Sequence, residues 1–167
     1  MIEIRHLCVS VEGKMILNDV NFNIDAGESI ALFGPNGSGK TSLLKVIIGI
    51  PQYTVEAGNI YFDGREITHC CIDERARLGI GMVFQHPPAV RGVRLRDLLR
   101  MCMEKNGTYQ EDRIDETAQQ LHFSDFLDRD VNLGFSGGEI KRSELLQLLA
   151  QRPRFVMLTS RIPVWIW

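Results

Sequence analysis

Apolar side chains recur with two periods along this chain, and the two periods predict strands and helices in alternation. Alternating or short continuous apolar runs predict β-strands over residues 2–11, 20–24, 29–33, 59–62, 80–84 and 155–158. Helical spacing of about 3.6 residues and helix end signals predict helices over residues 40–49, 73–78, 93–104, about 111–121 and 139–151. The alternation over residues 2–11 indicates an edge-type strand, whereas the apolar run over residues 29–33 suits a buried central strand.

Strands that alternate with helices predict an α/β fold with a mainly parallel sheet. The helices predicted between residues 93 and 130 form a helical insert in this scheme. The sequence has no internal repeat and no low-complexity linker. We therefore expect a single domain over residues 1–167.

Composition and charge exclude several classes of function. The chain has 167 residues and a formal net charge of −2, which argues against a protein that binds nucleic acid through its phosphates. Its apolar runs are shorter than the roughly 20 residues that span a bilayer, so we expect no membrane insertion. The first residues lack the pattern of a secretion signal, and the four cysteines are scattered. Both features fit a cytoplasmic location.

The strongest chemical signal is the segment 34–41, which matches the pattern G-x-x-x-x-G-K-[ST] between a predicted strand and a predicted helix. The backbone N–H groups of such a loop cradle phosphates, and the positive end of the following helix adds to the attraction. We expect the Lys40 amine to reach the β- and γ-phosphates and the Thr41 hydroxyl to hold Mg²⁺. The candidate phosphate-binding residues are Gly34, Pro35, Asn36, Gly37, Ser38, Gly39, Lys40, Thr41 and Ser42. The alternative is a glycine-rich turn with an incidental lysine, which the flanking elements disfavour.

A second signal lies at the start of the helix predicted over residues 139–151. Its candidate binding residues are Ser136, Gly137, Gly138 and Glu139. A serine followed three residues later by glutamate is also a capping box, which is a purely structural device. Two glycines weaken helix initiation, so their presence favours exposed N–H groups that an anion approaches closely.

The two segments together resemble the ATP-binding-cassette (ABC) ATPases. The resemblance implies a P-loop NTPase fold with N-terminal antiparallel strands and a helical subdomain, and it implies ATP and Mg²⁺ as cofactors. Gln85, at the end of the strand predicted over residues 80–84, takes the place of the family's Q-loop glutamine. The resemblance therefore implies a catalytic role for Gln85 and a contact with Mg²⁺.

Within this family the chain is similar to the ATPase of Suf-type iron–sulfur cluster assembly. The residues that carry this similarity are GFSGGE at 134–139, ERARLGI at 74–80, FQHPP at 84–88 and KRSELLQ at 141–147. The chain also has Val11 where most ABC ATPases stack adenine on an aromatic residue. The resemblance covers residues 1–158 and implies a cytoplasmic ATPase that serves SufB- and SufD-like scaffold proteins. It further implies an ATP-dependent homodimer in which residues 136–139 of one copy close over the nucleotide of the other.

The resemblance stops after Leu158. The family continues this strand into Asp-Glu-Pro, whose carboxylates position Mg²⁺ and the attacking water, but this chain reads Thr159, Ser160 and Arg161, and no carboxylate follows Arg154. Our hypothesis is that the tail 159–167 results from one lost nucleotide before codon 159, through mutation or a sequencing error, because codons can be chosen that restore Asp-Glu-Pro in the shifted frame. We therefore expect a C-terminally incomplete domain with weak or no ATP hydrolysis.

Two other functions stay open from the sequence. One is the ATP-binding subunit of an ABC membrane transporter, which the choice of partner distinguishes from iron–sulfur assembly. The other is a regulator or interaction module that binds nucleotide without hydrolysing it. The missing carboxylates favour this function.

Overall fold

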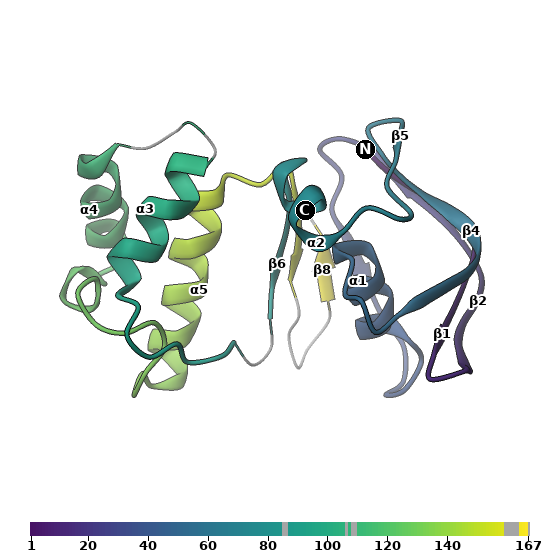
Figure 1. The fold of residues 1–167 in the computed structure, drawn as a ribbon, viewed down its shortest axis with the longest axis horizontal. Helices are drawn as coiled ribbons and strands as arrows, with labels where there is room; N and C mark the ends of the chain where they lie inside the picture. Colours follow the sequence, from purple (N-terminus) through teal and green to yellow (C-terminus); the bar gives the residue numbers. More distant parts are fainter. Residues whose placement is uncertain (85–86, 106, 108–109, 159–163, 167) are drawn as a thin grey trace. The chain divides into compact units, whose positions relative to one another are not determined.

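A computed structural model of the chain describes residues 1–84, 87–105, 107, 110–158 and 164–166. These residues form two compact units, one of residues 1–82 with 154–167 and one of residues 83–153. Figure 1 labels their helices and strands. The expectation of a single domain over residues 1–167 stays a prediction. In the described part of the chain, every helix is too short or too polar to span a membrane.

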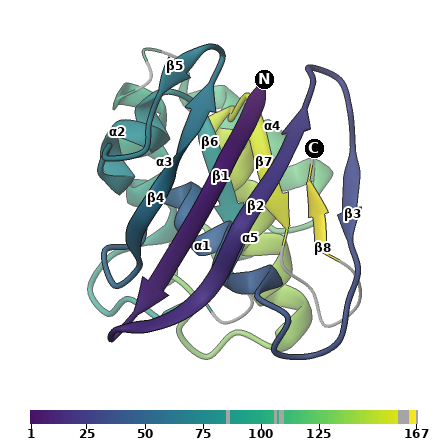
Figure 2. The same ribbon diagram turned by 90° about the vertical axis from the view of Figure 1, so that its right-hand side faces the viewer.

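An antiparallel sheet forms one side of the first unit. It contains β1 (Ile2–Val11), β2 (Lys14–Ile24), β4 (Thr54–Phe62) and β5 (Arg65–Glu66) in the order β2-β1-β4-β5. Figure 2 shows its first three strands side by side. The prediction that residues 2–11 form an edge strand is wrong, because β1 pairs with β2 on one side and with β4 on the other. The alternation of apolar residues reports which face of a strand is buried, and it carries no information about the strand's neighbours.

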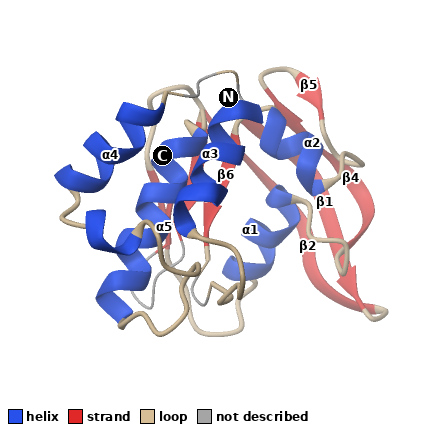
Figure 3. Cartoon of the chain, turned by 60° about the vertical axis from the view of Figure 1, so that its left-hand side comes forward, coloured by secondary structure: helices blue, strands red, loops and turns tan. Residues whose placement is uncertain are grey.

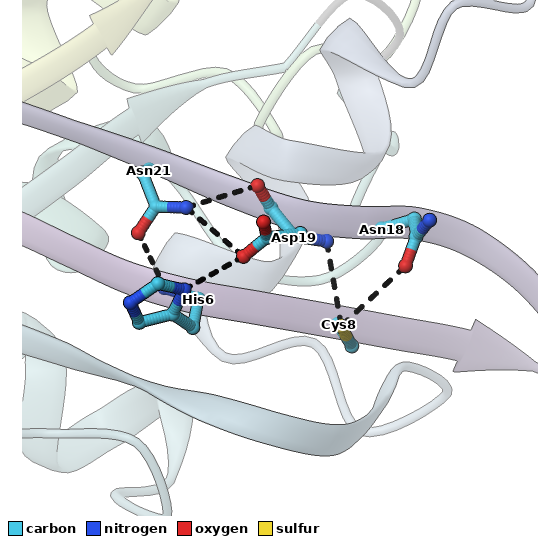
Figure 4. A network of polar contacts seen from close by, with 5 residues as sticks. All are labelled: His6, Cys8, Asn18, Asp19 and Asn21. Atoms are coloured by element: carbon cyan, nitrogen blue, oxygen red, sulfur yellow. Dashed lines mark hydrogen bonds and ion pairs between the residues drawn. The ribbon is translucent and has the colours of Figure 1, made fainter.

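A bulge interrupts β1 and its two partners at the same level. The registers of β1 with β2 and with β4 both shift near His6, and His6 and Asp19 have positive φ angles of 49° and 51°. The His6 Nδ1 atom lies 2.8 Å from Asp19 Oδ1, and its backbone N–H donates to Asn21 Oδ1 at 2.7 Å (Figure 4). On the other side a Cβ atom at Gly58 would lie 2.3 Å from the His6 carbonyl oxygen, so only glycine fits there.

The second sheet has the order β3-β8-β7-β6 and lies across α1 (Lys40–Ile48) from the first sheet (Figure 1). Its strands are β3 (Ile30–Leu32), β8 (Val164–Ile166), β7 (Phe155–Leu158) and β6 (Ile80–Val83). The strand β8 is antiparallel to both β3 and β7. The strands β3 and β7 therefore run in the same direction, as the predicted mainly parallel sheet requires, although both are paired with β8. The prediction that residues 29–33 form a buried central strand is wrong, because β3 is half-buried and stands at the end of the order of described strands.

One hydrophobic core holds the first unit together. Apolar side chains of α1 fill the space between the two sheets, and the core residues with the least exposure include Ile4, Leu7, Leu44, Ile47, Ile60, Phe62, Ile80 and Phe155. The short helix α2 (Ile72–Arg77) follows the first sheet. Because α1 is buried along most of its length, the loop at its N-terminal end is attached to a rigid support.

The second unit is helical. Its helices α3 (Leu95–Lys105), α4 (Glu111–Gln120) and α5 (Gly137–Gln151) lie against one another (Figure 3), and the short 3₁₀ helix Ser124–Phe126 lies between α4 and α5 in the sequence. Their core contains apolar residues of each helix and of the connecting loop, among them Leu99, Ile114, Ala118, Phe123, Leu127 and Leu146. This unit confirms the helices predicted between residues 93 and 151.

The elements otherwise differ from the prediction mainly at strand boundaries. The strands predicted over residues 20–24 and 59–62 begin earlier, at Lys14 and Thr54. The two-residue strand β5 and the strand β8 were not predicted. The first half of β2 lacks a clear alternation of apolar and polar residues, because the adjacent residues Asn18 and Asp19 are both exposed where the register shifts.

Candidate functional site

The loop 34–41, hereafter the phosphate loop, connects β3 to α1 and closes around the side chain of Lys40. The Lys40 Nζ atom donates to the carbonyl oxygens of Gly34 and Pro35, both at 2.8 Å, and to Ser38 Oγ at 3.3 Å. An ammonium group has three N–H donors. The loop thus holds the positive charge of Lys40 at its centre with all three donors used.

Two glycines of the phosphate loop are required by its backbone. Gly37 and Gly39 have φ angles of 84° and 87°, a region that side chains other than glycine rarely adopt. A Cβ atom at Gly39 would also lie 2.8 Å from Leu17 Cδ2, which belongs to the core. The glycines of the motif therefore allow the loop to turn sharply while α1 stays packed against β2.

The N-terminal end of α1 carries no acidic residue in its own first turn. Its N-cap residue Gly39 offers no side-chain hydrogen bond. The first intrahelical hydrogen bond runs from Leu43 N–H to the Gly39 carbonyl oxygen at 2.8 Å. The N–H groups before Leu43, together with the helix dipole, form an anion-binding end. Thr41 is exposed and Ser42 half-buried in this same turn.

The C-terminal end of α1 is held by Arg75 of α2, a residue to which the sequence assigned no role. Its side chain is only 3% exposed and donates to the carbonyl oxygens of Val46 (2.7 Å), Ile47 (2.9 Å), Thr68 (2.8 Å) and Cys70 (2.9 Å). Burial lowers the pKa of Arg75, but a guanidinium group keeps its proton in proteins. A buried cation at this end stabilises the helix dipole whose other end faces the phosphate loop.

The start of α5 in the second unit is a capping box. The Ser136 N–H donates to Glu139 Oε2 at 2.6 Å, and the Glu139 N–H donates to Ser136 Oγ at 3.4 Å. The hydrogen bonds from Ser136 lower the pKa of Glu139. Ser136 and Glu139 therefore form the capping box, which is the purely structural role that their spacing also predicts. Gly137 and Gly138 nevertheless face open space, since among the described residues no atom apart from their chain neighbours and the backbone of the same helix lies within 4 Å of a Cβ placed on either.

An aromatic cluster anchors this helix start. Phe135, 9% exposed, packs edge-on against Phe123 and Phe126, with ring centroids 5.7 and 5.2 Å away. The Arg129 guanidinium lies 5.0 Å from the ring centroids of both Phe126 and Phe135. Cation–π contacts of this kind stabilise the loop that precedes the helix. The phenylalanine before Ser136 thus fixes the position of the two glycine amides.

Gln85 lies outside the described residues, but the residue before it is tied to α5. The Phe84 N–H donates to Glu144 Oε1 at 3.1 Å. Burial raises the pKa of Glu144, and the hydrogen bond from Phe84 acts in the opposite direction. Glu144 belongs to the run KRSELLQ at 141–147, from which no function could be assigned to it. Its half-buried carboxyl group thus ties Phe84, the residue before Gln85, to the helix that carries Ser136.

The structure brings the candidate residues together in two places. The residues of the phosphate loop form one site in the first unit, and Ser136, Gly137, Gly138 and Glu139 form another at the start of α5 in the second unit. Among the residues whose placement is described, no three His, Cys, Asp or Glu side chains form a group that could hold a metal ion.

A glycine-rich loop between a strand and an uncapped helix, closed on its own lysine, defines a P-loop nucleotide-binding domain. The sequence model of the family described as "ABC transporter" matches residues 17–159. The chain belongs to this family, and its fold is that of the ABC ATPase nucleotide-binding domain.

Individual relatives agree with this family. A probable ABC transporter ATP-binding protein of Streptococcus pyogenes serotype M3 is 41% identical over 168 residues, which cover 95% of this chain and 65% of that protein. The chain thus spans about two-thirds of the length of this relative. A solved ATP-binding subunit of an ABC transporter has a TM-score of 0.81 at 23% identity, with 95% of this chain and 65% of that chain covered. The ATP-binding cassette MJ0796, solved as a dimer bound to ADP and phosphate, has a TM-score of 0.78 at 23% identity, with 95% and 73% covered.

Proposed function

We propose that this chain binds Mg-ATP, with the triphosphate in the phosphate loop. The observation that carries the proposal is the position of the Lys40 ammonium at the centre of the loop, 2.8 Å from the Gly34 carbonyl oxygen and beside the uncapped end of α1. A lysine charge and a helix N-terminus that converge on one loop attract a polyanion. Membership of the ABC family supports ATP as that polyanion.

Thr41 fits the role of a magnesium ligand. Its hydroxyl group is next to Lys40 in the exposed first turn of α1. Mg²⁺ keeps several waters and binds proteins through few side chains plus phosphate oxygens. One hydroxyl group beside the phosphates is therefore sufficient, and Gln85 is proposed as a further contact on the family resemblance. When bound, the ion neutralises charge on the phosphate oxygens.

Substitution of Lys40 tests nucleotide binding. Lys40→Ala removes the central charge and should weaken Mg-ATP binding by about 1–3 kcal/mol, the range of a charge-assisted hydrogen bond. The matched control is Lys45→Ala, which removes the same charge from the last turn of α1. Isothermal titration of the parent and both variants measures the difference. Equal affinity in the parent and in Lys40→Ala would contradict the assignment.

We further propose that Ser136, Gly137 and Gly138 contact the γ-phosphate held by a second copy of the chain. The open space at both glycines supports this role, because nothing in their own unit requires glycine there. The similar cassette solved as a dimer with ADP and phosphate supports a paired arrangement. Light scattering with and without Mg-ATP should show a dimer only with nucleotide, and Ser136→Arg should abolish it. A dimer that survives this substitution would refute the shared site.

The partner is proposed as a transporter permease, because the relative from Streptococcus pyogenes is named as a probable transporter ATP-binding protein. The second candidate is a SufB- or SufD-like scaffold, which the runs at residues 134–139 and 74–80 favour by resemblance. Affinity purification of the tagged full-length protein from its own cells distinguishes them. An integral membrane protein supports the first, and a soluble iron–sulfur scaffold supports the second.

A further inference from the structure

The strand β8 occupies a specific place beside the phosphate loop. It pairs with β3 through Ile30↔Ile166, Ala31↔Trp165 and Leu32↔Val164. On its other side it pairs with β7 through Met157↔Ile166 and Leu158↔Trp165. Since β3 and β7 are both antiparallel to β8, this one segment joins two strands that are distant in the sequence.

The pairing matters most for β3. This strand has three residues and stands at the end of the order β3-β8-β7-β6, so β8 is its one hydrogen-bonded strand in the described part of the chain. Gly34, whose carbonyl oxygen accepts from Lys40 Nζ, follows Leu32 after a single residue. A three-residue strand makes few hydrogen bonds and depends on its neighbour to stay in place. The phosphate loop is therefore attached to α1 at its C-terminal end and, through β3, to β8 at its N-terminal end.

We propose that residues 164–166 form a positioning strand, which holds β3 and thereby holds the phosphate loop in the geometry that binds Mg-ATP. This role deepens the proposed nucleotide binding, and its test by Mg-ATP affinity rests on that proposed function. Its test by hydrogen exchange of β3 needs no ligand and is independent of nucleotide binding. The sheet pairing acts through the backbone, so the identity of the side chain at residue 165 is secondary.

Two substitutions at residue 165 separate backbone from side chain. Trp165→Pro removes the backbone N–H and cannot extend a central strand, whereas Trp165→Val keeps the N–H and a high strand propensity. Hydrogen exchange of the amides of residues 30–32 is measured in the parent and both variants. We expect faster exchange in Trp165→Pro and parent-like exchange in Trp165→Val. Unchanged exchange in Trp165→Pro overturns the proposal.

Mg-ATP affinity is then titrated on the same three proteins. If Trp165→Pro leaves the loop correctly placed in about a tenth of the molecules, the apparent affinity falls about tenfold, and Trp165→Val binds as the parent does. Lost protection of β3 with unchanged affinity overturns the positioning role. If the parent itself binds no Mg-ATP, the proposed function fails, while the exchange measurement still decides whether β8 holds β3.

A cross-link keeps the proposal testable if Trp165→Pro fails to fold. Cysteines at the paired positions, Ala31→Cys with Trp165→Cys, should form a disulfide under mild oxidation, because directly opposed residues lie within reach. The control Ala31→Cys with Ile166→Cys places the two side chains on opposite faces and should react slowly. Peptide mapping separates the new disulfide from any that involve Cys8, Cys70, Cys71 or Cys102. Equal yields in both pairs would overturn the register and the proposal.

Discussion

Arg75 Nη1 donates to the carbonyl oxygen of Val46 at 2.7 Å, in the last turn of the helix whose first turn carries Lys40. Each residue places a positive charge at one end of α1. The charge at Arg75 is buried and lies where carbonyl groups point, so it stabilises the helix. The charge at Lys40 is held by the loop, where N–H groups point, and its attraction is available to an anion.

Arg75→Ala should therefore destabilise the first unit strongly. The substitution removes the guanidinium donor from four carbonyl oxygens, of which that of Val46 still accepts from Gly49 N–H, and we expect a loss of about 3 kcal/mol or more in the free energy of unfolding. Arg75→Lys should recover only part, since an ammonium has three donors. The matched control is Arg77→Ala on the same helix, which breaks an exposed pair with Asp73 and should cost less than about 1 kcal/mol. Urea denaturation measures all three, and equal losses for Arg75→Ala and Arg77→Ala would contradict the role.

Glu139→Gln should strengthen the nucleotide-dependent dimer. A glutamine at this position still accepts the hydrogen bond from Ser136 N–H and keeps the capping box. It removes a negative charge beside the amides of Gly137 and Gly138, where we propose that a phosphate binds. We expect a two- to fivefold lower dimer dissociation constant in Mg-ATP, a range that is about the size of a single charge effect at a helix end. Analytical ultracentrifugation measures the constant, with Glu139→Ala as the control that loses both cap and charge. A weaker dimer in Glu139→Gln would argue against phosphate binding there.

Glu144→Gln should stabilise the second unit at neutral pH. Burial raises the pKa of Glu144 in the folded state, so the unfolded chain loses the proton more readily than the folded chain does. The ionised carboxyl group therefore destabilises the folded state at a pH above its folded pKa. This destabilisation disappears as the pH falls below the pKa of the unfolded chain, about 4.3. The variant should be more stable than the parent at pH 7 and equal to it near pH 3.5.

Thermal denaturation over this pH range tests the prediction for Glu144. Glu116→Gln on α4 serves as the control, because Glu116 is exposed. A stability difference for Glu144→Gln that stays constant between pH 3.5 and pH 7 would assign the effect to packing and not to charge.

The chain should bind ATP without hydrolysing it at the usual rate. Thr159 and Ser160 stand where the family has its aspartate and glutamate, and positioned bases supply rate factors of about a hundredfold or more. The release of phosphate from ATP, measured on a preparation of known ATP affinity, should stay near background. Thr159→Asp with Ser160→Glu supplies both carboxylates without altering residues 164–166 and should recover turnover, whereas Thr159→Asp with Ser160→Gln should not. Rapid turnover by the 167-residue chain would show that another residue acts as the base.

Local sequence signals predicted the parts of the fold that depend on neighbours in the chain. The phosphate loop is specified by its glycines and by Lys40, and the capping box by Ser136 and Glu139 three residues later. The four carbonyl contacts of Arg75 could not be predicted, because Val46 and Ile47 meet it only after α1 has packed. The pairing of β8 with β3 escaped prediction for the same reason, since three residues carry no periodicity of their own.

The hydrogen bonds from Lys40 to Gly34, Pro35 and Ser38 also bear on the kinetics of ligand capture. A loop that is shaped by its own lysine loses its conformational freedom when the protein folds, before any nucleotide arrives. Encounter with ATP then exchanges one set of polar partners for another and needs little ordering of the backbone. Association should accordingly proceed in a single fast step whose rate rises linearly with nucleotide concentration, and discrimination between nucleotides should reside in their rates of departure.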